Sequence, residues 1–143
     1  MNITIKNKLE QWFLFACENY NKEGGGPQKA IDRWMESQFN TIIKKTTNAM
    51  NETMFRTAIM TGFFDLQRHL KWYLRRRAGR INTQIINQII ETQTKMLTPF
   101  TPHLCEEIWM KLQKQGLITQ ETWPVHEEAK INSTLEAQET IIT

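Results

Sequence analysis

The chain has 143 residues, of which 40% are hydrophobic and 23% charged; this suits one globular domain and excludes a multidomain enzyme, a disordered chain and a collagen-like protein. Its first residues lack the charged and apolar regions typical of a signal peptide, and it has no run of about 18 apolar residues. Its two cysteines, Cys17 and Cys105, cannot form a disulfide framework, so we expect a cytoplasmic protein that does not contact a membrane. The net charge of +3 is only mildly basic, so the distribution of charge says more about partners than its sum.

Apolar residues at helical spacing predict two long N-terminal helices. The first covers residues 5–20 and ends in the glycine-rich stretch 21–27. The second carries an apolar stripe over residues 31–50. Its far side is expected to be solvent-facing and polar: Arg33, Asn40, Lys44 and Thr47.

A third helix is predicted over residues 55–74, with Phe55, Phe63 and Leu70 on its apolar stripe. It should end within residues 76–80. Continuing the helix would point Arg77 into the same face as Leu70, which is an unfavourable place for a charge.

Two further helices and a return segment complete the chain. Asn82 or Thr83 can cap a fourth helix that Pro99 closes, and Thr101 followed by Pro102 opens a fifth, which continues to residue 116. Residues 117–118 and 123–125 are expected to run in extended form back over the helices.

These elements predict an all-α fold: an antiparallel bundle of about five helices with a short extended C-terminal segment. The bundle domain is expected to span residues 1–125. From residue 121 to the end, five Glu oppose Lys130 alone. Residues 126–143 are therefore expected to form an acidic tail or linker with little to pack on.

The sequence patterns of common enzyme classes are absent, because the chain has no Walker or GxGxxG loop, no HExxH and no GxSxG. His103 and Cys105 fall on different sides of a helix and have no second pair of ligands, so no metal site is expected. Glu106 and Glu107 suit the start of a helix better than an acid/base pair. We expect no catalytic centre, metal or cofactor in this chain.

One stretch of the chain is strongly basic, since residues 66–90 contain six basic residues and no carboxylate. Arg68, Lys71 and Arg75 fall within about 60° of one another, opposite the apolar stripe of the third helix, and should face solvent. With the arginines that follow, they would form a ridge able to track a phosphate backbone. The predicted RNA contacts are Arg68, Lys71, Arg75, Arg76, Arg77 and Arg80, with Lys44 and Lys45 as weaker candidates.

Two other interpretations of these basic residues are possible from the sequence. Cations at a helix C-terminus complement the helix dipole and keep a bundle soluble, so the ridge can be a plain solvated face. It can also belong to a non-enzymatic helical module that binds an acidic protein.

Several stretches resemble one enzyme family. Residues 99–109, P-F-T-P-H-L-C-E-E-I-W, resemble the P-F-x-P-H-x-x-E-E-[IL]-W segment of the helical anticodon-binding domain in class I leucyl-, valyl- and isoleucyl-tRNA synthetases. The triplet Asp32-Arg33-Trp34 resembles the D-R-W that opens a long helix there. Residues 51–58, 61–67, 72–76 and 123–124 are similar to leucyl enzymes of archaeal and eukaryotic cytosolic type.

The resemblance implies a tRNA-docking domain of a larger, cytosolic leucine–tRNA ligase, with a valyl or isoleucyl enzyme as the alternative. The family's HIGH and KMSKS motifs are absent here, so the resemblance implies that ATP, Mg and the aminoacylation reaction belong to upstream domains. It also implies a further domain after the acidic tail. The expected partners are a leucine tRNA and the other domains of the same enzyme, which is expected to be monomeric. Pro99, Pro102, His103 and Trp109 would form a helical corner and core.

Overall fold

The computed structural model describes residues 3–22, 28–77, 81–132 and 134, and within these ranges all regular secondary structure is helical, as predicted. The elements are α1 (Ile3–Asn19), α2 (Ala30–Asn51), α3 (Phe55–Ile59), a π-helical turn η1 (Met60–Asp65), α4 (Leu66–Arg76), α5 (Thr83–Leu97), α6 (Pro102–Lys111) and the short 3-10 turns η2 (Ile118–Gln120) and η3 (Glu128–Lys130). No helix in the described part is long and apolar enough to cross a membrane.

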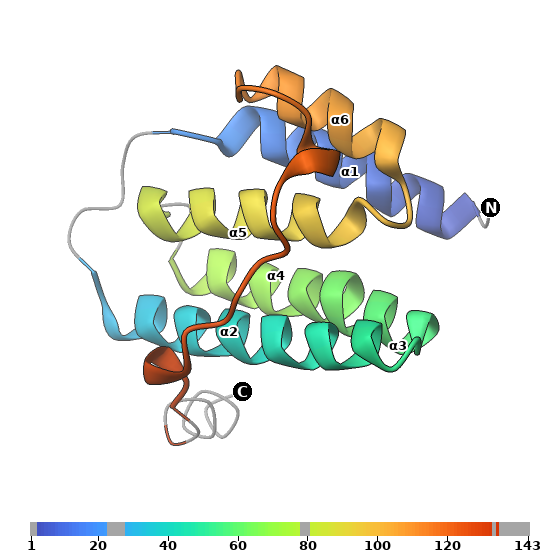
Figure 1. Cartoon of the computed structure of the whole chain (residues 1–143). Coiled ribbons are helices and arrows are strands. Elements are labelled where there is room, and N and C mark those ends of the chain that lie inside the picture. The colour runs from blue at the N-terminus through green and yellow to red at the C-terminus, as the bar shows by residue number, and fades with distance from the viewer. Residues whose placement is uncertain (1–2, 23–27, 78–80, 133, 135–143) are drawn as a thin grey trace.

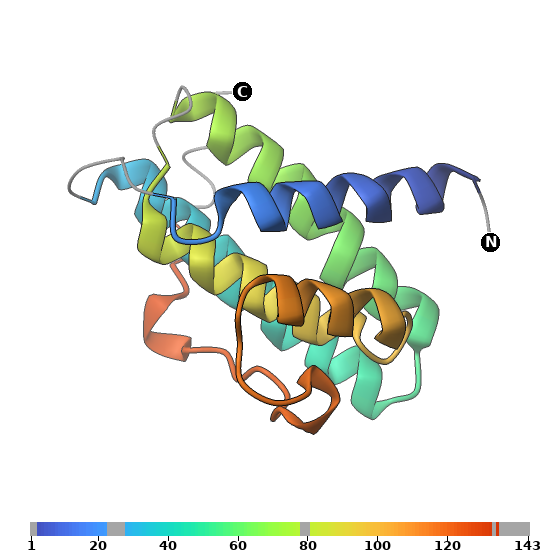
Figure 2. The ribbon, with the colours of Figure 1, turned by 90° about the horizontal axis from the view of Figure 1, so that it is seen from above.

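The helices are stacked in three levels. Figure 1 shows α1 and α6 at the top, α5 and α4 in the middle and α2 at the bottom. Seen from above, α1 crosses α4 obliquely, and α6 lies beside α1 and over α5 (Figure 2). The core between the levels is apolar because each helix turns its hydrophobic stripe inward. Its largest fully buried hydrophobic side chains are Trp12, Tyr73, Phe63, Met35, Leu66, Ile86, Ile89, Ile90 and Ile108.

The predicted third helix is one continuous run of α3, η1 and α4, interrupted by the π-helical turn. A π-helical turn holds an extra residue, which leaves carbonyl groups without their usual partners and rotates the two flanking helical pieces relative to each other. Gln93 on α5 is fully buried, and its Nε2 donates hydrogen bonds to the carbonyls of Gly62 (3.0 Å) and Phe63 (3.4 Å). The rotation explains one wrong prediction: Phe55 is 50% exposed, and Ala58 is buried in its place.

Gly62 allows the π-helical turn to approach α2 closely. A Cβ added there would lie 3.0 Å from Cγ2 and 3.1 Å from Oγ1 of buried Thr46. We expect Gly62→Ala to lower the free energy of unfolding by about 1–3 kcal/mol through overpacking, although the same change in an open helix stabilises it. Urea unfolding followed by circular dichroism measures this.

The matched control for Gly62→Ala is the same substitution in a Thr46→Ala background, where the added methyl has room. There it should be neutral or stabilising. An equal loss in both backgrounds would show that the contact with Thr46 is not the cause.

The C-terminal segment crosses the face of α2, as Figure 1 shows. The indole Nε1 of Trp123 donates to Oγ1 of Thr47 (2.8 Å), the backbone N–H of Glu127 donates to Oδ1 of Asn40 (2.8 Å), and that of Asn132 donates to Oγ of Ser37 (2.7 Å). The predicted return over the bundle is confirmed for residues 123–125, whereas Ile118, predicted to be extended, begins the 3-10 turn η2. Residues 126–132, predicted to have little to pack on, are exposed or half-buried but contact α2 through these hydrogen bonds, and Asn40, predicted to face solvent, is buried beneath them.

Candidate nucleic-acid interface

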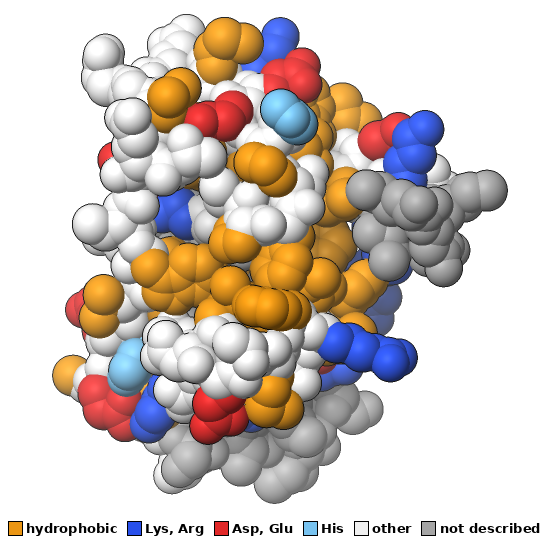
Figure 3. Space-filling model, turned by 45° about the vertical axis from the view of Figure 1, so that its right-hand side comes forward, with side chains coloured by type: hydrophobic (Ala, Val, Ile, Leu, Met, Phe, Trp, Pro, Cys, Tyr) orange, Lys and Arg blue, Asp and Glu red, His pale blue; other side chains and the backbone are white. Residues whose placement is uncertain are grey.

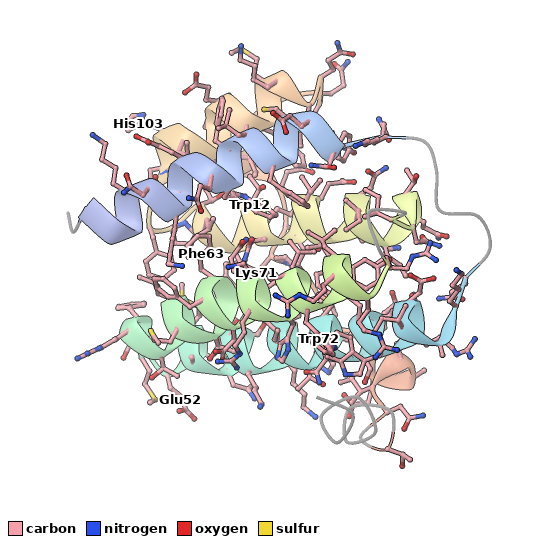
Figure 4. All side chains as sticks on the ribbon, turned by 180° about the vertical axis from the view of Figure 1, so that it is seen from behind. Trp12, Glu52, Phe63, Lys71, Trp72 and His103 are labelled. Carbon is pink, nitrogen blue, oxygen red and sulfur yellow. The ribbon has the colours of Figure 1, made fainter. Side chains whose placement is uncertain are left out.

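The basic side chains of α4 lie on the face opposite its core contacts. Leu66, Leu70 and Tyr73 turn inward and are buried, since residues three and four apart share one face of a helix. The exposed cations are Arg68, Lys71, Arg75 and Arg76, which we call the α4 ridge. In the view from behind, α1 and α4 face the reader, with Lys71 on the side of α4 towards α1 and Trp72 on the side towards α2 (Figure 4).

The charges of the ridge are only partly neutralised within the protein. Arg68 lies 3.3 Å from Oδ1 of Asp65, and its side chain is 71% exposed. The guanidinium of Arg76 lies over the ring of Trp72, 6.0 Å from the centroid. For Lys71 and Arg75, no ion pair is formed within the described ranges. Closely spaced, exposed cations of this kind can neutralise an external polyanion.

Arg77 is the main correction to the predicted site. It was expected on the ridge, but it is 4% exposed, and its Nε lies 3.5 Å from Oδ1 of Asp32 on α2. Its backbone remains close to helical at the end of α4, so the side chain follows Leu70 and Tyr73 into the core. A guanidinium enclosed in this way cannot contact RNA.

Asp32 is the centre of a buried polar cluster that fixes the end of α4. Its carboxylate accepts hydrogen bonds from the phenol of Tyr73 (2.5 Å) and from the backbone N–H of Lys29 (2.6 Å), and the N–H of Asn82 donates to the Tyr73 oxygen (3.3 Å). Burial and the bond to Asp32 raise the pKa of Tyr73, so the phenol keeps its proton and remains a donor. The cluster joins α2, α4 and the start of α5 directly beneath the ridge.

The two weaker candidates, Lys44 and Lys45, lie on α2 and not on the α4 ridge. Lys44 pairs with Glu128 at 3.2 Å, on the side of α2 that the C-terminal segment covers. Lys45 is exposed on α2. Arg80 lies outside the described residues.

The residues considered above for catalysis or metal binding form no such site among the described residues. Glu106 accepts hydrogen bonds from the N–H of Ile118 (2.6 Å) and from Oγ1 of Thr119 (3.0 Å), which anchors the segment after α6. Burial raises the pKa of the Cys105 thiol to about 12. Within the described residues, no three metal-ligating side chains come together.

The structure adds a groove that the sequence patterns did not predict. It lies between α1 and the helix formed by η1 and α4, and has a volume of about 450 Å³. Phe15 and Phe64 contribute apolar surface, while Lys8, Arg68 and Lys71 stand around it. We call it the α1/α4 groove.

A second surface feature is apolar. Figure 3 shows hydrophobic side chains gathered in a band across one face of the molecule. Around α3, Met54, Phe55 and Met60 are each about half exposed. Clustered exposed apolar side chains of this kind are typical of contact surfaces.

Comparisons with known proteins agree with the resemblance found in the sequence. Leucine–tRNA ligase of Aeropyrum pernix is 37% identical over 131 residues, covering 92% of this chain and 14% of that protein. Leucine–tRNA ligase of Pyrococcus furiosus is 38% identical over 140 residues, covering 94% and 14%. The chain thus spans about one seventh of the length of these curated relatives.

The fold recurs in a solved structure. LeuRS of Agrobacterium radiobacter, in a ternary complex with tRNA and LeuAMS, matches with a TM-score of 0.73 at 18% identity, over 90% of this chain and 16% of that one. A family model described as the anticodon-binding domain of tRNA ligase matches residues 32–143. The chain belongs to this family of anticodon-binding domains.

Proposed function

We propose that this chain is the tRNA-docking domain of a leucine–tRNA ligase and that the α4 ridge holds the phosphate backbone of the tRNA. The observation that carries the proposal is the set of four exposed cations along α4, of which Lys71 and Arg75 form no ion pair among the described residues. In protein–DNA complexes, half to two-thirds of the hydrogen bonds go to phosphate and sugar, and these contacts position the nucleic acid without reading its sequence.

In this proposal, the catalytic activity belongs to other domains of the full-length ligase. The relatives named above are leucine–tRNA ligases about seven times as long as this chain. Leucine activation with ATP and Mg then belongs to other domains of the same cytoplasmic polypeptide, and this bundle contributes binding and orientation of the tRNA. The choice of leucine tRNA over other tRNAs rests on those relatives.

The apolar surface around α3 supports a second part of the same proposal, which is contact with neighbouring domains. Met54, Phe55 and Met60 would be covered in the full-length ligase. Covering them stabilises the assembly by removing apolar area from water.

The test is a site-specific photocrosslink to a leucine tRNA. A benzophenone amino acid replaces Lys71 on the ridge in one sample, and Met110 on α6, which is 68% exposed, in the other. We expect crosslinked tRNA from position 71 and little from position 110, because α6 packs against α1 and α5 on the side away from the ridge. Equal yields from both positions, or none from position 71, would contradict the assignment.

A further inference from the structure

The α1/α4 groove combines an apolar interior with a basic edge. Phe15 and Phe64 are half-buried, and Leu70 beneath them is buried. Lys8 on α1 and Lys71 on α4 are exposed on opposite sides, and neither forms an ion pair within the described ranges. Among the described residues that line the groove, none carries a carboxylate. An occupant that suits it has a flat or apolar group and negative charge.

The aromatic walls are held in place before any ligand arrives. The ring of Phe15 stacks on Trp12, with centroids 5.7 Å apart and planes 24° apart. The ring of Phe64 meets Phe63 edge to face at 5.2 Å. Trp12 and Phe63 are fixed in the core, with exposed fractions of 1% and 2%. Walls that are already ordered lose little side-chain entropy when a ligand binds.

The π-helical turn contributes to the same surface. Nε2 of Gln67, which lines the groove, donates to Oε1 of Gln93 at 2.5 Å. Gln93 in turn donates to the carbonyls of the π-helical turn, whose residue Phe64 forms part of the wall. The amide of Gln67 is therefore oriented by the same buried side chain that satisfies the turn. π-helical turns are rare and occur frequently at functional sites.

We propose that the α1/α4 groove binds one unstacked nucleotide of the tRNA, with its base against Phe15 and Phe64 and its phosphate between Lys8, Arg68 and Lys71. The inference rests on the proposed function, because it assigns a nucleotide to the groove beside the α4 ridge. Unpaired bases stack on aromatic side chains, and side chains with amides or cations bind their edges and phosphates. The groove volume of about 450 Å³ falls within the range of about 300–1,000 Å³ typical of small-molecule sites.

Charge favours a nucleotide over a purely apolar occupant, because Arg68 and Lys71 belong both to the groove and to the ridge. A backbone that follows the ridge passes the groove, so one of its bases can enter without a second binding event. An acidic peptide with an aromatic side chain is the competing occupant, and the experiment separates the two.

The experiment measures affinities for a leucine tRNA transcript and for a blunt RNA duplex that has no unpaired nucleotide. The double variant Phe15→Leu with Phe64→Leu keeps the walls apolar and removes both rings. Since stacking on an aromatic ring is worth about 1–3 kcal/mol per base, we expect the affinity for the tRNA to fall at least about fivefold. The affinity for the duplex and the salt slope for the tRNA should stay unchanged, because no charge is removed.

Two further variants guard against a loss of fold. Leu74→Trp fills the groove from its edge and should also lower the affinity for the tRNA alone. Phe64→Tyr keeps a ring and should retain binding. Circular dichroism and urea midpoints identify any variant that has lost its structure.

The outcomes separate the groove from the ridge. If both groove variants fold and bind tRNA as tightly as the unmodified chain, the nucleotide proposal is overturned while the docking function stands. If the unmodified chain binds neither RNA, the proposed function itself fails. If the variants abolish binding of a glutamate-rich, phenylalanine-containing peptide and leave tRNA binding intact, the groove belongs to an acidic protein.

Discussion

Asp32→Asn is expected to lower the free energy of unfolding by about 3–5 kcal/mol, because removing one partner of a buried ion pair leaves the other charge uncompensated. Asp32 is fully buried, and the side chain of Arg77 beside it is only 1% exposed. The asparagine keeps the shape of the carboxylate but has one acceptor oxygen, whereas Tyr73 and Lys29 donate to separate oxygens of Asp32. The loss therefore reports the missing negative charge together with one lost hydrogen bond. Urea unfolding followed by circular dichroism measures it.

The control is a double-mutant cycle with Arg77→Met. Removing both charges together leaves no buried ion without a partner, so the double variant should be more stable than the sum of the single losses predicts. Strictly additive losses would show that Asp32 and Arg77 do not stabilise each other. Since natural domains are stable by only about 5–15 kcal/mol, the single variant should also loosen the end of α4.

Reversing two charges of the α4 ridge should weaken binding of tRNA strongly without affecting the fold. Lys71 and Arg75 are exposed, so Lys71→Glu with Arg75→Glu removes two phosphate contacts and adds repulsion. Because affinity depends on salt with a log–log slope of about −0.9 per phosphate, two lost contacts correspond to roughly 10- to 100-fold weaker binding at 0.1 M salt. Fluorescence anisotropy with labelled tRNA measures the loss.

The matched control reverses two exposed lysines elsewhere, at Lys6 on α1 and Lys111 on α6, which changes the net charge equally. If binding depends on the ridge, the control should lose much less affinity. Equal losses in the two variants would assign the effect to overall charge. A collapsed circular dichroism spectrum of the ridge variant would instead give Lys71 and Arg75 a structural role.

The helices and their order could be predicted because apolar spacing and capping residues are local signals. Pro102 at the first position of α6 and Asn82, which caps α5 by accepting from the N–H of Ile85, are both where the sequence placed them. The prediction for Arg77 shows the limit of such signals. Periodicity placed this residue on the inner face, but only the fold brings Asp32 from α2 to receive its charge.

The π-helical turn and the groove depend on contacts that no local pattern contains. In the sequence, Gly62 is one small residue in an apolar stripe. A glycine is needed there because the backbone lies close to Thr46 on a different helix. Phe15 and Phe64 lie beside the core stripes of their helices, and aromatic residues off the stripe are the one sequence signal that could have indicated a groove. The packing of residues 126–132 was missed because it uses polar contacts with Asn40 and Ser37 rather than apolar spacing.

The measurement that tests the central claim most directly is the salt dependence of binding between the unmodified chain and a leucine tRNA. Four ridge cations that each neutralise one phosphate predict a log–log slope of about −3 to −4, and an unrelated tRNA should give a similar slope because backbone contacts carry no sequence information. A slope between 0 and about −1, or no binding at 50 mM salt, would contradict the account and leave the ridge as a solvated face.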